Sequence, residues 1–149
     1  MIEGWASYTE TICYFQGETE VMVDLRVAVP PATRTELAAI GLRGPFGVLT
    51  AFNPRGVELG EADNSRRALE LEAELVGLGL EFVRVDCCSP DRSHCECSVA
   101  VIAPRDQVLE MARRWEQLAI FWWDGAVFRI HGAVTAGVLG LPVLSQRRG

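Results

Sequence analysis

The sequence lacks an excess of basic residues, a long apolar run and a secretion signal. Its formal net charge is −6 and its pI is about 4.9. Nonspecific nucleic-acid binding depends on Lys and Arg displacing counterions from phosphates, so this charge argues against a nucleic-acid partner. No apolar run reaches the ~18 residues of a membrane helix, and the acidic start MIEGWASYTE has no apolar signal-peptide core. We therefore expect a cytoplasmic protein of bacterial type, with neither membrane nor nucleic acid as partner.

Common catalytic motifs are also missing. The chain has no hydrolase-type order of Ser, His and Asp, no phosphate-cradling glycine loop and no HExxH motif. His131 follows Ile130 near the end of the last predicted strand, so we expect it at the surface rather than in catalysis. The absence of a recognisable pair of nucleophile and base favours a binding module over an enzyme.

What the sequence does contain is enough apolar material for a core. Of its 149 residues, 49% are hydrophobic and 23% are charged, which suits one globular domain that buries most of its unfolded surface. No internal repeat or low-complexity linker interrupts it. We expect a single domain over residues 1–149 with its core in 47–130.

Hydrophobic periodicity predicts the elements of that domain. Alternating apolar residues indicate a half-buried strand over 20–29, and the run at 47–53 is apolar on both faces, as in an interior strand. Helical spacing of apolar residues predicts two amphipathic helices, and Asp124-Gly125 predicts a hairpin turn. The predicted elements after residue 46 are strand 47–53, helix 60–79, strands 81–87 and 97–103, helix 105–118, and strands 119–123 and 126–130.

This order of elements predicts the fold class. Strand, helix, strand, strand, helix, strand is the order of a ferredoxin-like split βαβ core, an α+β fold, here with an extra N-terminal strand and a C-terminal hairpin strand. Two helices cover only one face of such a sheet, yet its interior strands are apolar on both faces. Three covers are available for the second face: the N-terminal 45 residues, the C-terminal segment with Val138, Leu139, Leu141 and Val143, or a second copy in a homodimer.

The same order brings polar residues to one rim of the predicted sheet. Strands 47–53 and 97–103 are antiparallel neighbours in this fold, which places Asn53 close to Glu96. Asn64 lies on the inward stripe of the first helix. The residues expected to converge at this rim are Asn53, Arg55, Asn64, Arg67, Glu96 and Gln117.

Two interpretations of the rim remain open. In a binding site, Asn53 and Asn64 would hold a polar ligand, Glu96 would act as a general base or bind a cationic group, and Arg55 with Arg67 would hold an anion. In a structural role, the asparagines would cap loop amides and Glu96 would pair with a nearby arginine, because buried polar groups need partners in any case.

Sulfur is concentrated in the stretch DCCSPDRSHCECSVAV at 86–101, which carries four of the five cysteines. Three thiolates and one imidazole, from Cys88, His94, Cys95 and Cys97, could form a zinc site on a hairpin, but their spacing matches no common template. A Cys88–Cys95 disulfide fits the hairpin geometry but is disfavoured in a reducing cytosol. We therefore expect no metal and no cofactor, and reduced, half-buried cysteines on the strands.

Four segments of the chain resemble an uncharacterised bacterial family known as domain of unknown function 3293 (DUF3293). They are TAFNPRG, NSRR, SPDRSHCECSVAV and ARRWEQLAIFWWDG, and the resemblance spans residues 47–128. The positions that match the family's pattern are Asn53, Pro54, Asn64, Glu96 and Gln117. Trp115-Glu116-Gln117 stands where the family has Phe-Gly-Gln, which leaves the placement of Gln117 open. The resemblance implies no activity.

Taken together, these patterns predict a small cytosolic protein with a noncatalytic binding or regulatory role. Its expected partner is a small polar or anionic ligand held at the rim, with a homodimer as a further expectation. The alternative is a small enzyme that acts on a polar small molecule with Glu96 as general base.

Overall fold

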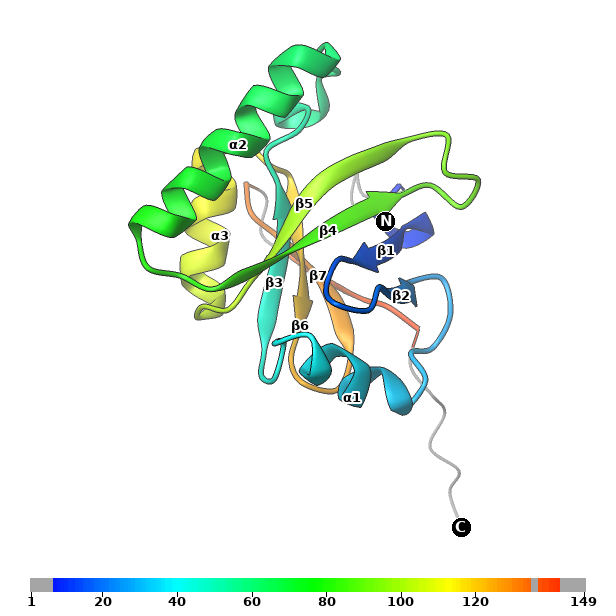
Figure 1. Ribbon diagram of the computed structural model, residues 1–149. Helices are drawn as coiled ribbons and strands as arrows, with labels where there is room; N and C mark the ends of the chain where they lie inside the picture. The colour runs from blue at the N-terminus through cyan, green and yellow to red at the C-terminus, as the bar shows by residue number, and fades with distance from the viewer. Residues whose placement is uncertain (1–6, 135–136, 143–149) are drawn as a thin grey trace.

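The computed structural model describes residues 7–134 and 137–142, which form one curled antiparallel sheet with three α-helices (Figure 1). Its eight strands lie in the order β2-β1-β4-β5-β3-β6-β7-β8. The strands are β1 (Ile12–Phe15), β2 (Val21–Asp24), β3 (Phe46–Thr50), β4 (Phe82–Cys88), β5 (Cys95–Val101), β6 (Ala119–Trp123), β7 (Phe128–Gly132) and β8 (Val138–Gly140). The helices are α1 (Ala32–Ala39), α2 (Glu61–Gly77) and α3 (Arg105–Arg114), with short 3-10 turns η1 (Tyr8–Glu10) and η2 (Pro54–Gly56).

The predicted ferredoxin-like α+β fold is wrong. Two strands, β1 and β2, extend the sheet beyond β4, and two more, β7 and β8, extend it beyond β6. The right-handed twist of each strand accumulates across all eight, so the sheet coils into a half-barrel instead of the predicted open layer, a four-stranded core with one N-terminal and one C-terminal strand added. The prediction missed this because β1 and β8 are only four and three residues long, which is too short for a clear alternating pattern.

Strand β3 is the centre of the half-barrel. It pairs antiparallel with β5 on one side and with β6 on the other. Phe46 and Val48 belong to the core of one face and Leu49 to the core of the other. The expectation of an interior strand with two apolar faces is therefore confirmed.

The concave face is filled by aromatic residues. Ring centroids lie 5.8 Å apart for Phe15 and Phe46, 5.8 Å for Phe46 and Phe128, and 4.7 Å for Trp123 and Phe128. Leu37 of α1 is fully buried in the same cluster. The N-terminal strands and α1 thus supply one of the three expected covers.

The C-terminal segment adds to this cover. Leu141 is buried in the concave cluster and Leu139 packs against it, whereas Val138 is exposed and Val143 lies outside the described residues. The apolar face that suggested a homodimer is thus covered within the chain. The homodimer itself stays a prediction.

The convex face is covered by α2 and α3 (Figure 1). A Cβ at Gly47 would lie 2.6 Å from Cγ1 of Val108, so α3 can approach β3 this closely only because residue 47 is glycine. Helix α3 ends at Arg114 rather than at the predicted residue 118, since Glu116 has a left-handed backbone with φ 58°. Within the described ranges, no helix combines the length and the apolarity needed to span a bilayer.

Replacing Phe46 by Ala should unfold the half-barrel at lower denaturant. Phe46 is 0% exposed and contacts three aromatic rings, so Phe46→Ala should lower the free energy of unfolding by about 3–5 kcal/mol. Leu69→Ala, on a side chain that is 65% exposed, is the matched control and should change it by less than about 0.5 kcal/mol. Urea denaturation followed by tryptophan fluorescence measures both, and equal effects would contradict the assignment of Phe46 to the core.

Candidate functional site

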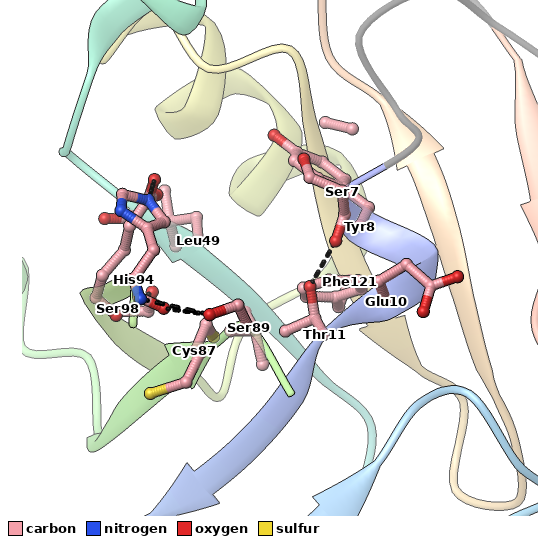
Figure 2. A pocket seen from close by; sticks show the side chains of 15 residues that line it. Ser7, Tyr8, Glu10, Thr11, Leu49, Cys87, Ser89, His94, Ser98 and Phe121 are labelled. Atoms are coloured by element: carbon pink, nitrogen blue, oxygen red, sulfur yellow. Dashed lines mark hydrogen bonds and ion pairs between the residues drawn. The ribbon is translucent and has the colours of Figure 1, made fainter. Parts of the chain in front are cut away.

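A cleft opens at the rim of the half-barrel where η1, the end of β3 and the β4–β5 hairpin meet. It consists of two adjoining cavities with volumes of about 220 and 320 Å³, both lined by Ser7, Tyr8, His94 and Glu96. Figure 2 shows the first cavity, with Ser7, Tyr8 and Thr11 on one side and Ser89, His94 and Ser98 across from them. We call the two cavities together the rim cleft. Their volumes are near the lower end of those of small-molecule sites.

The strand pairing explains why Glu96 reaches this cleft. Thr50, the last residue of β3, lies opposite Ser98 of β5, so the chain after Thr50 passes beside the start of β5. Nδ2 of Asn53 donates a hydrogen bond to Oε2 of Glu96 at 3.3 Å. The predicted proximity of Asn53 and Glu96 is thus confirmed, although the fold from which it was argued is wrong.

Asn53 is held in place by Asn64. The backbone of Asn53 is left-handed, with φ 46°, a conformation that Asn tolerates better than most residues. Asn64 is 6% exposed; its Oδ1 accepts the backbone N–H of Asn53 at 2.9 Å, and its Nδ2 donates to Oδ1 of Asn53 at 2.9 Å. The backbone N–H of Leu59 also donates to Oδ1 of Asn53. Both asparagines therefore position the turn, and together they direct the side-chain nitrogen Nδ2 of Asn53 at Glu96.

Gln117 has a similar role on the other side of the turn. It is buried, and its Nε2 donates to the carbonyl oxygens of Phe52 at 2.9 Å and Trp115 at 3.1 Å. It also lines the larger cavity. The substitution of Trp-Glu for the family's Phe-Gly therefore leaves Gln117 beside the cleft.

The two arginines predicted at the rim are not directed into the cleft. Arg67 donates to the carbonyl oxygens of Ala51 at 2.6 Å and Trp115 at 2.9 Å, and its guanidinium lies 5.1 Å from the centre of the Trp115 ring. The side chain of Arg55 is 70% exposed, 3.9 Å from Glu116. Arg67 thus stabilises the contact between β3, α2 and the end of α3, and neither arginine lines the cavities.

Glu96 and His94 form the polar centre of the cleft. Nε2 of His94 lies 3.1 Å from Oε2 of Glu96, the same oxygen that accepts from Asn53. The Glu96 side chain is 26% exposed. In the described part of the chain, its other oxygen, Oε1, has no hydrogen-bond partner. The sequence suggested only a metal-ligand role for His94, because a residue in a hairpin loop gives no sign of which way its ring turns.

Tyr8 is a residue of the cleft that the sequence did not predict. Its ring lies 5.5 Å from that of Phe121, centre to centre. Burial, and then the negative charge of Glu96, raise the pKa of the Tyr8 phenol, so the hydroxyl loses its proton even less readily than a free phenol does. No sequence pattern pointed to Tyr8 as a cleft residue, because it lies near the N-terminus, far in sequence from most of the other residues of the cleft.

The cysteine hairpin differs from the prediction. Cys88 and Cys95 are joined in a disulfide, whereas reduced thiols were expected. The bond occupies two of the four side chains considered for zinc, the others being His94 and Cys97. Among the residues described, no group of three or more His, Cys, Asp or Glu side chains is placed to hold a metal ion.

The placement of His131 was also predicted wrongly. It is 7% exposed rather than on the surface, and its Nε2 has no hydrogen-bond partner among the described residues. Burial, followed by the positive charges of Arg105 and Arg129, lowers the pKa of His131. His131 does not line either cavity of the rim cleft.

A model of the family described as a protein of unknown function (DUF3293) matches residues 49–120 of the chain. This match supports the resemblance drawn from the motifs. It includes Asn53, Asn64, Glu96 and Gln117 but not Tyr8, so the N-terminal wall of the cleft lies outside the matched segment. Comparison with curated proteins and with solved structures gave no match.

Asn64→Asp should destabilise the fold although it is nearly isosteric. The carboxylate keeps an acceptor for the Asn53 amide but loses the donor to Oδ1 of Asn53 and places a charge in a buried position. We expect a loss of about 1–3 kcal/mol in the free energy of unfolding. Ser65→Ala, at the next and exposed position of α2, is the control and should have little effect. If both variants unfold at the same urea concentration, Asn64 does not hold the turn.

Asp91 should titrate well below a normal aspartate. Its carboxylate accepts hydrogen bonds from the hydroxyl and backbone N–H of Ser93 and the hydroxyl of Ser89, which lower its pKa from 3.8 to about 2. A lowered pKa means that the stabilisation is complete above pH 3.8 and is lost as the pH falls towards 2. Carboxyl-carbon NMR titration measures the midpoint. Ser93→Ala should move it back towards 3.8, and a normal midpoint in the unmodified protein would disprove the loop geometry.

Proposed function

We propose that the rim cleft binds a small molecule that has a positively charged, hydrogen-bond-donating group and a compact apolar body. One observation carries this proposal: Glu96 lines both cavities, its Oε2 is held by Asn53 and His94, and its Oε1 has no partner among the described residues. A partly buried carboxylate with one open oxygen is a strong acceptor for an ammonium or amidinium group. Under this proposal the protein is a noncatalytic binding module.

The charges around the cleft support a cation rather than an anion. Three carboxylates line the two cavities, those of Glu10, Glu58 and Glu96. His94 is the one basic side chain among the described lining residues, and it already contacts Glu96. An anionic ligand, as expected from Arg55 and Arg67, would find neither arginine in the lining of the cleft.

The walls of the smaller cavity support an apolar body for the ligand. Val48 of β3 and Ala119 and Phe121 of the adjacent strand β6 line it, and the ring of Tyr8 packs against Phe121. Removing apolar surface of the ligand from water would add to the attraction of the carboxylate. A ligand with one charged end and one apolar end fits this arrangement better than a sugar or a nucleotide.

The contact between His94 and Glu96 also supports a second candidate, an enzyme with Glu96 as general base. A histidine 3.1 Å from a carboxylate can orient it and share its proton. Ser89 does not supply a nucleophile to this pair, because its hydroxyl bonds Asp91 and the backbone of the hairpin loop rather than the His94 ring. Turnover of a bound amine that is lost in Glu96→Gln would favour this candidate.

Benzylamine, benzyl alcohol and benzoate are probes that share a phenyl ring and differ in their polar end. We expect ligand-observed NMR to detect binding of benzylamine, weaker binding of benzyl alcohol and none of benzoate. Glu96→Gln should weaken benzylamine binding about tenfold to a hundredfold, the value of one charged hydrogen bond. Glu36→Gln removes the same charge from the exposed face of α1 and should leave binding unchanged. Preferential binding of benzoate, or no effect of Glu96→Gln, would refute the proposal.

Two expectations from the sequence remain predictions beside this proposal. One is the cytoplasmic location, and the other is the homodimer. Neither is needed for the geometry of the rim cleft, which is built from residues of one chain.

A further inference from the structure

A second pair of cysteines lies beside the disulfide, across the next strand pair. Cys13 of β1 is directly opposite Cys87 of β4, and their sulfur atoms are 3.8 Å apart. Both are free thiols. Cys87 precedes Cys88 in the chain, so the two pairs share strand β4 and lie on opposite faces of it.

The two pairs occupy equivalent positions in their ladders. The backbone N–H of Gln16 donates to the carbonyl oxygen of Arg84, and hydrogen-bonded positions alternate along an antiparallel pair, which makes Cys13 and Cys87 a non-hydrogen-bonded pair. The N–H of Ser89 donates to the carbonyl oxygen of His94, so the same argument applies to the disulfide pair. At such positions the two backbones come closest and the side chains face each other. Cys13 and Cys87 are therefore arranged as the joined pair is.

The two thiols differ in their access to solvent. Cys13 is 0% exposed, whereas Cys87 is partly buried and lines the smaller cavity of the rim cleft. The hydrogen bond with Cys87, and then burial, raise the pKa of the Cys13 thiol. A reagent in the cleft thus meets Cys87 first and finds Cys13 behind it.

We propose that Cys87 and Cys13 form a thiol–disulfide exchange site that opens into the rim cleft and reacts with small disulfides such as oxidised glutathione. The thiolate of Cys87 attacks one sulfur of the small disulfide, whose S–S bond breaks, and one thiol leaves after taking up the proton that Cys87 lost. Cys13, as its thiolate, then attacks the sulfur of Cys87 and displaces the second thiol, which takes up the proton from Cys13. The protein loses two hydrogen atoms and gains one S–S bond, while the small disulfide is reduced to two thiols.

The product would link three adjacent strands through sulfur. The sulfur atoms of Cys13 and Cys87 need to approach from 3.8 Å to about 2.05 Å, and their strands are already paired. The new bond would tie β1 to β4, and the existing bond ties β4 to β5. Since β1 follows η1 directly, oxidation would fix the N-terminal wall of the cleft to the hairpin wall. This inference goes beyond ligand binding and does not depend on which molecule the cleft binds.

Nonreducing peptide mapping of the full chain tests the exchange. The protein is incubated with oxidised glutathione, its remaining thiols are alkylated, and it is digested with trypsin without reduction. Cleavage after arginine places Cys13 in peptide 1–26, Cys87 with Cys88 in peptide 85–92, and Cys95 with Cys97 in peptide 93–105. Before oxidation we expect a linked pair of peptides 85–92 and 93–105, and afterwards a linked set of all three.

Three variants assign the bond and serve as controls. Cys13→Ser should stop the reaction at a glutathione adduct on Cys87, and Cys87→Ser should leave Cys13 as a free thiol. Cys97→Ser removes a third free thiol, which has no cysteine opposite it in the ladder, and should behave as the unmodified chain does. Recovery of Cys13 and Cys87 as alkylated thiols after oxidation, or a link from peptide 1–26 to Cys97, would overturn the proposal. In the unmodified chain, fragmentation of the linked set shows whether Cys87 or Cys97 carries the alkyl group, and this decides the bond even if a variant does not fold.

Discussion

The structure depends on the burial of strand β3 on both of its faces. Phe46 and Val48 require an apolar partner on one side, and Leu49 requires one on the other. Helices α2 and α3 meet the second requirement, with Gly47 allowing α3 to come close. The apolar partner for Phe46 and Val48 comes from the curl of the sheet, because its own strands and α1 then enclose the concave face. The curled shape is thus the way in which this chain buries a strand that no second helical layer covers.

The curl also creates the site. It brings η1 to the rim where β3 ends and β5 begins, so N-terminal residues and residues from the middle of the chain surround one cleft. Asn64, buried under the turn after β3, holds Asn53, and Asn53 holds one oxygen of Glu96. A partly buried carboxylate is costly unless its oxygens have partners, and the open oxygen of Glu96 is where a ligand can supply one. This relation links the packing of the fold to the proposed binding of a cationic group.

Sulfur has a different part in the same region. The disulfide lies on the convex face of the β4–β5 hairpin and holds together the strands that carry Glu96 and Cys87. Cys87 points to the other face, where it packs against the concave core and borders the cleft. Adjacent cysteines of one strand therefore point to opposite faces of the sheet, as the alternation of side chains requires, and at the rim both border the smaller cavity.

The sequence alone determined helices α2 and α3, the central strand and the nearness of Asn53 to Glu96, because these follow from local periodicity and from one strand pairing. It also allowed a structural role for the asparagines, and the contacts of Asn53 and Asn64 show that they have one. Tertiary structure alone decided the number of strands, the half-barrel, the place of Tyr8 and the pairing of Cys13 with Cys87. The physical reason is that short edge strands such as β1 and β8 have little pattern of their own. They are held by ladder hydrogen bonds and by an enclosed core whose partners lie far away in the chain, and such contacts leave no local periodic signal.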